Sequence, residues 1–171
     1  MKKQIAVIGR DLHADNELLK EAEKVGRLIA EKGAVLICGG HGGIMRAAAK
    51  GAKSAGGITV GILPEVDKTK VNEYIDIAIP TGINQARNMT IALTADVVIA
   101  LAGGVGTLSE MCFAYIYHKP IIALVGQGGW SEKLADSYID EKRIVKIIPA
   151  HSAEEAVELA SNVIETKKKT L

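Results

Sequence analysis

The sequence predicts an α/β protein in which a mainly parallel sheet is covered by helices on both faces. Short apolar, β-branched runs recur along the 171 residues, segments of helical periodicity separate them, and the runs are continuously apolar. Because right-handed crossovers leave few topologies for such a chain, we expect one Rossmann-like, doubly wound domain over residues 1–171.

The N-terminal half alternates strand with helix. Apolar residues recur at helical spacing after the first strand until Gly33 ends that helix. A segment without periodicity, 65–74, is expected to form an exposed loop. The expected strands cover residues 4–9, 34–40, 58–64 and 75–80, and the expected helices cover residues 16–33 and 43–57.

The C-terminal half continues the alternation with shorter elements. We expect strands at 96–104, 120–126 and 143–149, and helices at 83–95, from Thr107 onward, at 131–139 and at 152–169. No linker, internal repeat or low-complexity segment interrupts the pattern, which agrees with one domain.

Composition excludes several partners. The 21 basic and 20 acidic side chains nearly cancel, so nothing predicts nucleic-acid or membrane-surface binding. The apolar runs are too short to span a membrane, and "MKKQIAVIGR" is better interpreted as a first strand than as a signal peptide. Cys38 and Cys112 lie in apolar settings without metal-ligand spacing, so we expect free thiols in the cytoplasm.

Ligands of parallel sheets bind beyond the carboxyl ends of the strands, which directs attention to the loops after residues 9, 38 and 101. The first loop keeps only Gly9 of the dinucleotide pattern G-x-G-x-x-G, and the Walker pattern is absent. Both observations argue against a nicotinamide or flavin dehydrogenase and against a P-loop phosphotransferase.

The loop after the second strand reads "GGHGGIM". Its glycines allow backbone N–H groups to approach an anion at a helix N-terminus, although a tight strand-to-helix turn explains them equally. His41 either binds a phosphate or faces solvent. The candidate binding residues of this loop are Gly39, Gly40, Gly42 and Gly43.

The third loop, "AGGVGTLSE", is a second candidate anion site. Its candidate residues are Gly103, Gly104, Gly106 and Thr107 for binding and Glu110 for catalysis. Thr107 and Glu110 also have the T-x-x-E spacing of a capping box, in which each side chain satisfies a backbone donor. That alternative would make the carboxylate structural.

Arg87 precedes this loop on an apolar helix, with Asn88 beside it. An arginine in such surroundings normally has an anionic partner, here Glu110 or a ligand phosphate. Two glycine-lined helix starts and one arginine therefore indicate a site for a phosphate monoester with an attached sugar.

The stretch "QARNMTIALTADVVIALAGGVGTLSE" resembles the LONELY GUY (LOG) family, whose signature is an Arg-Lys pair followed by P-G-G-x-G-T-x-x-E. Arg87 lies sixteen positions before Gly103, as in that family. Asn88 replaces the lysine and Ala102 the proline, departures that bear on catalysis more than on binding. The stretch "GGHGGIMRAAAKGAKSAGGITVGILP" is more similar to the molybdenum cofactor carrier proteins, which also have Arg-Asn.

The resemblance implies hydrolysis of a nucleoside 5′-monophosphate at the N-glycosidic bond. The glycine loops would hold the phosphate, Glu110 and Arg87 would act on the ribose, and no metal or cofactor is required. The carrier-like branch implies instead that the same loops hold the molybdenum cofactor as cargo without turnover. A nucleotide-sensing module is a third interpretation.

An interface is expected on the helix that contains "MCFAYIYH". Its apolar side chains extend around most of the circumference, which indicates a partner helix in a homodimer, as the resemblance also implies. The side chains concerned are Phe113, Tyr115, Ile116 and Tyr117. Trp130 either covers the ligand mouth or packs at a loop.

Overall fold

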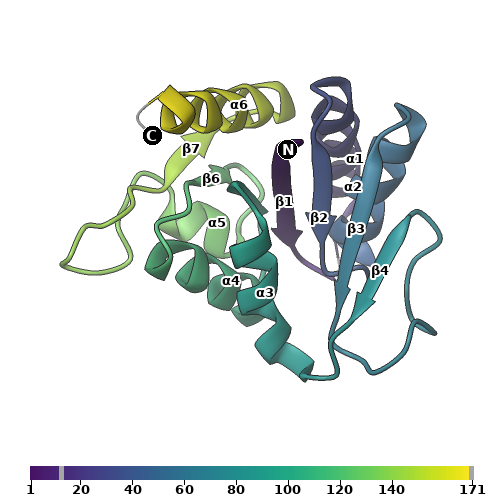
Figure 1. Ribbon diagram of the computed structural model, residues 1–171. Coiled ribbons are helices and arrows are strands. Elements are labelled where there is room, and N and C mark those ends of the chain that lie inside the picture. The colour runs from purple at the N-terminus through teal and green to yellow at the C-terminus, as the bar shows by residue number, and fades with distance from the viewer. Residues whose placement is uncertain (12–13, 170–171) are drawn as a thin grey trace.

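The computed structural model describes residues 1–11 and 14–169. Within these residues, seven parallel strands form one sheet in the order β4-β3-β2-β1-β5-β6-β7. The fold is therefore the predicted Rossmann-like α/β fold (Figure 1). The strands are β1 (Gln4–Gly9), β2 (Val35–Cys38), β3 (Ile58–Leu63), β4 (Ile77–Pro80), β5 (Val97–Leu101), β6 (Ile121–Leu124) and β7 (Ile148–Ala150).

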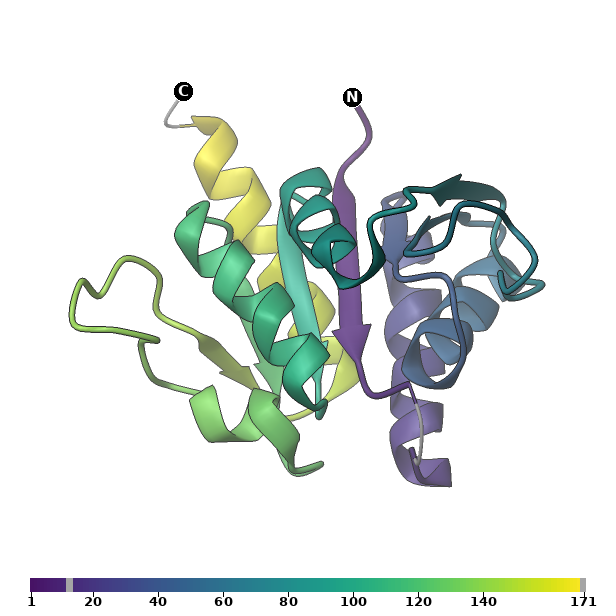
Figure 2. The ribbon, with the colours of Figure 1, turned by 90° about the horizontal axis from the view of Figure 1, so that it is seen from below.

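Helices cover both faces of the sheet (Figures 1 and 2). Helices α1 (Asn16–Glu31), α2 (Gly43–Ser54) and α6 (Ala153–Lys169) pack on one face. Helices α3 (Arg87–Thr94), α4 (Val105–Ile116) and α5 (Gly129–Leu134) pack on the other, and a short 3-10 turn, η1 (Asn84–Ala86), precedes α3. The inner strands of the sheet therefore have two buried faces, which explains their continuous apolar runs, whereas the edge strand β4 exposes Ile77 and Ile79.

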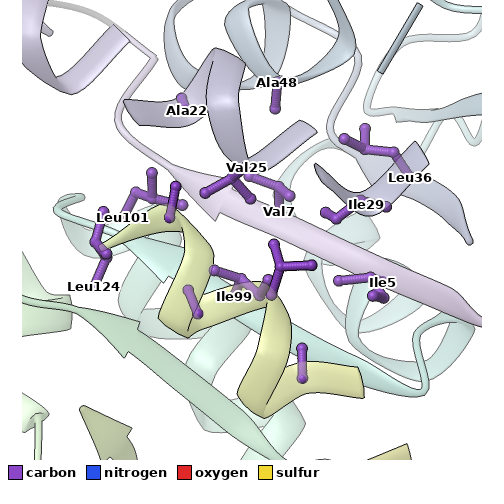
Figure 3. Packing of buried hydrophobic residues seen from close by; sticks show 14 of the residues in the cluster. Ile5, Val7, Ala22, Val25, Ile29, Leu36, Ala48, Ile99, Leu101 and Leu124 are labelled. Carbon is purple, nitrogen blue, oxygen red and sulfur yellow. The ribbon is translucent and has the colours of Figure 1, made fainter. Parts of the chain in front are cut away.

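The hydrophobic core divides into two layers because successive strand residues point to opposite faces. On β1, Ile5 and Val7 pack beneath α1 and α6 together with Val25 (Figure 3). Ala6 and Ile8 of the same strand face α3 and α4. Both layers hold the carboxyl edge of the sheet in place, where the chain enters the loops.

The last strand is shorter than predicted. β7 has three residues, which are the last two of the predicted segment 143–149 and the residue that follows it. Ile147 pairs with the preceding loop instead: it accepts from the N–H of Asp136 (3.0 Å) and donates to the carbonyl of Ser137 (2.9 Å). This long-range pairing could not be inferred from an apolar run.

The predicted helix 131–139 is also shorter. α5 starts at Gly129 and ends at Leu134, shortly before Asp136, whose φ of 57° is incompatible with a continuing helix. The loop 135–147 stands away from the body of the molecule in both views (Figures 1 and 2).

Tyr115 does not lie on an exposed helix face as predicted. It is buried, with 3% of its surface exposed, and its hydroxyl donates to Asp140 (2.6 Å) and accepts from the N–H of Ile144 (2.9 Å). The side chain therefore anchors the loop 135–147 to α4. Of the other predicted residues, Phe113 is partly buried, and Ile116 and Tyr117 are exposed.

Membrane insertion has no candidate segment among the described residues. None of the helices there combines the length and the apolar character that crossing a bilayer requires.

Candidate functional site

A cavity of about 360 Å³ is lined by residues that follow β1, β2, β3 and β5 and by the starts of α3 and α4. The predicted site residues that line it are Gly9, Gly39, Arg87, Asn88, Gly104, Gly106, Thr107 and Glu110. Those that do not line it are Gly40, Gly42, Gly43 and Gly103. The structure thus brings the three predicted loops together at one edge of the sheet.

The start of α4 is open to the cavity. Its N-cap, Gly104, supplies no side-chain hydrogen bond, and a Cβ added at Gly104 or Gly106 would have no atom within 4 Å. The first backbone N–H groups of a helix have no partner within the helix and carry its positive dipole end. This helix start can therefore accept an anion.

The capping-box interpretation of the third loop is wrong. The helix begins at Val105, two residues before the predicted Thr107, so Thr107 lies in the first turn and cannot act as N-cap. The cause is the backbone before it: Gly103 has a φ of 93°, and Gly104 is extended. Glu110 has no cap to form and lines the cavity instead.

Among the described residues, the Arg87 guanidinium has one hydrogen bond to the protein and one donor without a partner. Its side chain is buried, with 6% exposure, and Nη1 donates to the carbonyl of Ile62 (3.1 Å), while the buried Nε has no partner in the described chain. Of the two anionic partners expected for Arg87, Glu110 forms no ion pair with it within 4.0 Å among these residues. A buried donor without an acceptor costs about 1–3 kcal/mol, which a bound ligand oxygen would recover.

Glu110 is the second charged group in the cavity. Burial raises the pKa of its carboxyl from 4.5 to about 7, and the positive charge of Arg87 opposes this rise without cancelling it. With 8% exposure, the carboxyl is largely removed from water. Near neutral pH it can therefore exist in both forms, as acceptor or as donor.

The start of α2 is closed by the chain itself, contrary to the expectation of two anion-binding loops. The N–H of Ile44 donates to the carbonyl of Arg10 (3.0 Å), and a Cβ at Gly43 would collide with the backbone of Asp11. A Cβ at Gly42 would lie 3.0 Å from Asp11 Oδ1. The segment after β1 crosses this helix start, so the second loop serves mainly as a tight turn.

Asn88 fixes the start of α3 to the first turn of α4. Its side-chain N–H donates to the hydroxyl of Ser109 (2.7 Å), which in turn donates to the carbonyl of Gly106 (2.7 Å). Asn88 is 2% exposed. This chain of hydrogen bonds sets the position of Arg87, the preceding residue, relative to the open helix start.

Several lining residues were not predicted: Arg10, Asp11, Met45, Pro64 and Gln85. Arg10, Asp11 and Pro64 follow strands, Gln85 precedes α3, and Met45 lies in the first turn of α2, so their position at the carboxyl edge was a usable signal. His41 also lines the cavity and is bonded to Glu65, so it is not merely a solvent-facing loop residue. Trp130 packs against the core layer under α4 and does not line the cavity.

The two cysteines are free thiols, as predicted. Burial raises the pKa of Cys38 to about 11, so it is an unreactive thiol behind the cavity wall. Within residues 1–11 and 14–169, no group of three or more His, Cys, Asp or Glu side chains could hold a metal ion.

Fold and site together define a Rossmann-like α/β protein with a polar cavity at the carboxyl edge of its sheet. The sequence profile of the SLOG cluster4 family matches residues 2–157, and the chain belongs to this family, within the LOG-like superfamily near the molybdenum cofactor carrier branch.

Three relatives show what the chain is similar to. A cytokinin riboside 5′-monophosphate phosphoribohydrolase of Mycobacterium tuberculosis is 31% identical over 157 residues, covering 82% of this chain and 84% of the relative. The solved molybdenum cofactor binding protein of Rippkaea orientalis is 39% identical, with a TM-score of 0.86, covering 96% and 98% of the two chains. An uncharacterized protein of Archaeoglobus fulgidus is 48% identical over 121 residues, or 71% of this chain and 79% of the relative.

Proposed function

We propose that this protein binds a phosphorylated, nucleotide-like small molecule, with the phosphate at the start of α4. The observation that carries this proposal is the buried Nε of Arg87, which has no partner in the described chain and belongs to the same cavity as the open helix start. The cavity of about 360 Å³ suits a mononucleotide-sized ligand. The start of α2 is a weaker candidate for the phosphate, because the carbonyl of Arg10 already accepts from the N–H of Ile44 there.

The chemistry that the site supports best is hydrolysis of the N-glycosidic bond of a nucleoside 5′-monophosphate. Water adds to C1′, the C1′–N bond breaks, and its electron pair leaves with the base, which takes up a proton. As a carboxylate, Glu110 stabilises the positive charge that develops on the sugar and accepts the proton of the attacking water. Arg87 orients the phosphate and sugar. The phosphoribohydrolase relatives support this assignment.

A panel of nucleoside monophosphates tests the reaction. The expected result is release of free base and ribose 5-phosphate, lost in Glu110→Gln while binding of the nucleotide persists. Absence of cleavage at high protein concentration, with an affinity change as the sole effect of Glu110→Gln, would exclude the enzyme.

A second candidate is a non-catalytic carrier of the molybdenum cofactor. The likeness to the Rippkaea orientalis protein favours it, as does the replacement of the LOG lysine by Asn88, whose amide bonds to Ser109 and adds no charge to the site. Purification from a host that makes the cofactor is the test. Pterin fluorescence in the purified protein supports the carrier, whereas an empty site that binds AMP tightly supports the hydrolase or a nucleotide-sensing module.

We also propose a homodimer through α3 and α4 in the cytoplasm. Leu93, Ile116 and Tyr117 expose 41%, 56% and 42% of their surfaces on these helices, which leaves an apolar face to cover. The unpaired cysteines fit a reducing compartment. Light scattering tests the assembly, and a species of monomer mass alone would exclude it.

A further inference from the structure

His41 occupies the opposite side of the cavity from the start of α4. The cavity is lined by the residues that follow β3, β2, β1 and β5, which are neighbours in the sheet in that order. At roughly 4.8 Å per strand spacing, the ends of β3 and β5 lie about 14 Å apart. A ligand whose phosphate sits at α4 therefore reaches its other end near Pro64 and His41.

The position of His41 is fixed through both its side chain and its backbone. Nε2 lies 3.0 Å from Glu65 Oε2, and the carbonyl of His41 accepts from the buried side-chain amide of Asn72 (2.8 Å). Asn72 also donates to the carbonyl of Gly40 through its backbone N–H (2.9 Å) and its side chain (3.0 Å). The loop 65–74 thus holds the imidazole against the cavity wall.

The Glu65 contact determines which ring nitrogen can act on a ligand. Burial alone would raise the pKa of the Glu65 carboxyl, but the hydrogen bond from His41 and nearby positive charge outweigh it and lower the pKa. Glu65 is therefore a carboxylate and can only accept. A neutral imidazole that donates Nε2–H to it leaves Nδ1 as an acceptor, and among the described residues Nδ1 has no hydrogen-bond donor.

The rest of this end of the cavity is suited to a flat ring. Met45 and Pro64 line it with apolar surface, and the sulfur of Met45 lies next to the Arg87 guanidinium, as both would collide with a Cβ at Gly39. From the open start of α4 and Glu110, the cavity leads to an end that combines the Arg87 guanidinium, bonded to the carbonyl of Ile62 in β3, with the apolar surface of Met45 and Pro64 and one hydrogen-bond acceptor.

We propose that His41, held by Glu65, is a specificity-determining residue that accepts a hydrogen bond from an exocyclic amine on the ligand's heterocyclic ring. This inference rests on the proposed binding of a phosphorylated ligand at α4 and names the chemistry of its other end. The ring is an aminopurine or an aminopterin, which share a flat nitrogen heterocycle bearing an amine donor.

Two matched ligand pairs test the assignment by isothermal titration calorimetry. AMP differs from purine riboside 5′-monophosphate only in the 6-amino group, and GMP differs from inosine 5′-monophosphate only in the 2-amino group, which pterins share. We expect the amine-bearing member of one pair to bind about three- to tenfold more tightly, the worth of one neutral hydrogen bond. The pair that shows the difference distinguishes an adenine-type from a pterin- or guanine-type ring.

Variants assign the difference to His41. In His41→Ala the two members of the pair should bind equally, while the affinity for ribose 5-phosphate, which lacks a ring, stays within twofold. Glu65→Gln should reduce the discrimination, because the proton on Nε2 is no longer fixed. His151→Ala, an exposed histidine that does not line the cavity, is the matched control and should leave all affinities unchanged.

The following results would overturn the assignment of His41. Equal affinities within both pairs for the unaltered protein, or an equal loss for all ligands including ribose 5-phosphate in a folded His41→Ala, would show that His41 does not recognise the amine. Failure of every phosphorylated ligand, ribose 5-phosphate included, would instead refute the proposed function, and the assignment with it.

Discussion

The guanidinium of Arg87 lies against Gly39, in the space that any side chain at position 39 would occupy. A Cβ added at Gly39 would come closer than 3.0 Å to Nη1 and Nη2 of Arg87 and to the sulfur of Met45. The glycine after β2 is therefore required by the arginine from α3, a residue 48 positions later in the chain.

Replacing this glycine should displace the arginine. We expect Gly39→Ala to lower ligand affinity at least about tenfold and the free energy of unfolding by roughly 1–3 kcal/mol, the usual cost of overpacking. Gly106→Ala is the matched control for stability, since its Cβ meets nothing within 4 Å and alanine favours a helix. Urea unfolding measures the stability of both variants and calorimetry the affinity of Gly39→Ala; an equal free energy of unfolding for the two variants would contradict the close packing at Gly39.

Arg87 itself should contribute to binding more than to stability. In Arg87→Met the hydrogen bond to Ile62 is lost, but so is a buried donor without an acceptor, so we expect the unfolding free energy to change by less than about 1 kcal/mol. The affinity for AMP and for ribose 5-phosphate should fall at least about tenfold.

Arg27→Met is the matched control for Arg87→Met. Arg27 lies on the surface of α1, where it forms an ion pair with Glu31, and it does not line the cavity. The change should leave both affinities unchanged. A folded Arg87→Met that retains full affinity for ribose 5-phosphate would be inconsistent with a phosphate-binding role.

Glu110 should make the unliganded protein less stable as the pH rises from about 4.5 to 7. Its folded-state pKa, about 7, lies above the unfolded value of 4.5, so in this window the folded state binds more protons than the unfolded state. The stability contributed by the protonated carboxyl is complete below 4.5 and lost as the pH passes 7. Its size is at most roughly 3 kcal/mol.

Urea titrations across this pH range measure whether the free energy of unfolding falls as the pH rises. Glu110→Gln should flatten the decline relative to the parent protein, whereas the exposed Glu141→Gln should not. Identical pH profiles of Glu110→Gln and the parent would mean that burial does not perturb this carboxyl.

Tyr115→Phe should loosen the loop 135–147. The variant loses the hydroxyl that bonds Asp140 and the N–H of Ile144, so we expect a loss of about 1–3 kcal/mol and faster proteolysis within the loop. Tyr117→Phe is the control: the hydroxyl of this exposed tyrosine, directly after α4, bonds the sulfur of Met89 rather than the loop 135–147, so the change should affect neither. Limited proteolysis with mass spectrometry measures the difference, and protection equal to that of the parent would argue against the anchor.

Most of the fold could be predicted because it depends on local patterns. The run at β1 and the helix ended by Gly33 are readable from apolar spacing, and the α1 boundary differs from expectation by only two residues. The predictions failed where a contact between segments distant in sequence sets the local structure. Ile147 pairs with the loop that contains Asp136 instead of extending β7, and Tyr115 turns inward to bond Asp140 instead of facing solvent.

The site was predictable in composition but not in detail. Arg87, Glu110, Gly104 and Gly106 were identified as candidates, and the structure places them around one cavity, whereas the candidate Gly103 does not line it. Thr107 and Glu110 have capping-box spacing, yet the helix start depends on the positive φ of Gly103 rather than on that spacing.

The order of strands and helices, and the edge of the sheet that carries the candidate site, follow from side-chain periodicity and chain direction, so both could be inferred from the residues alone. The folded chain was needed to show that Arg10 closes the start of α2, that the start of α4 is open, and that Arg87 is buried with an unmet donor. Burial and hydrogen-bond partnership depend on segments far apart in sequence, and no local pattern encodes which of those segments meet.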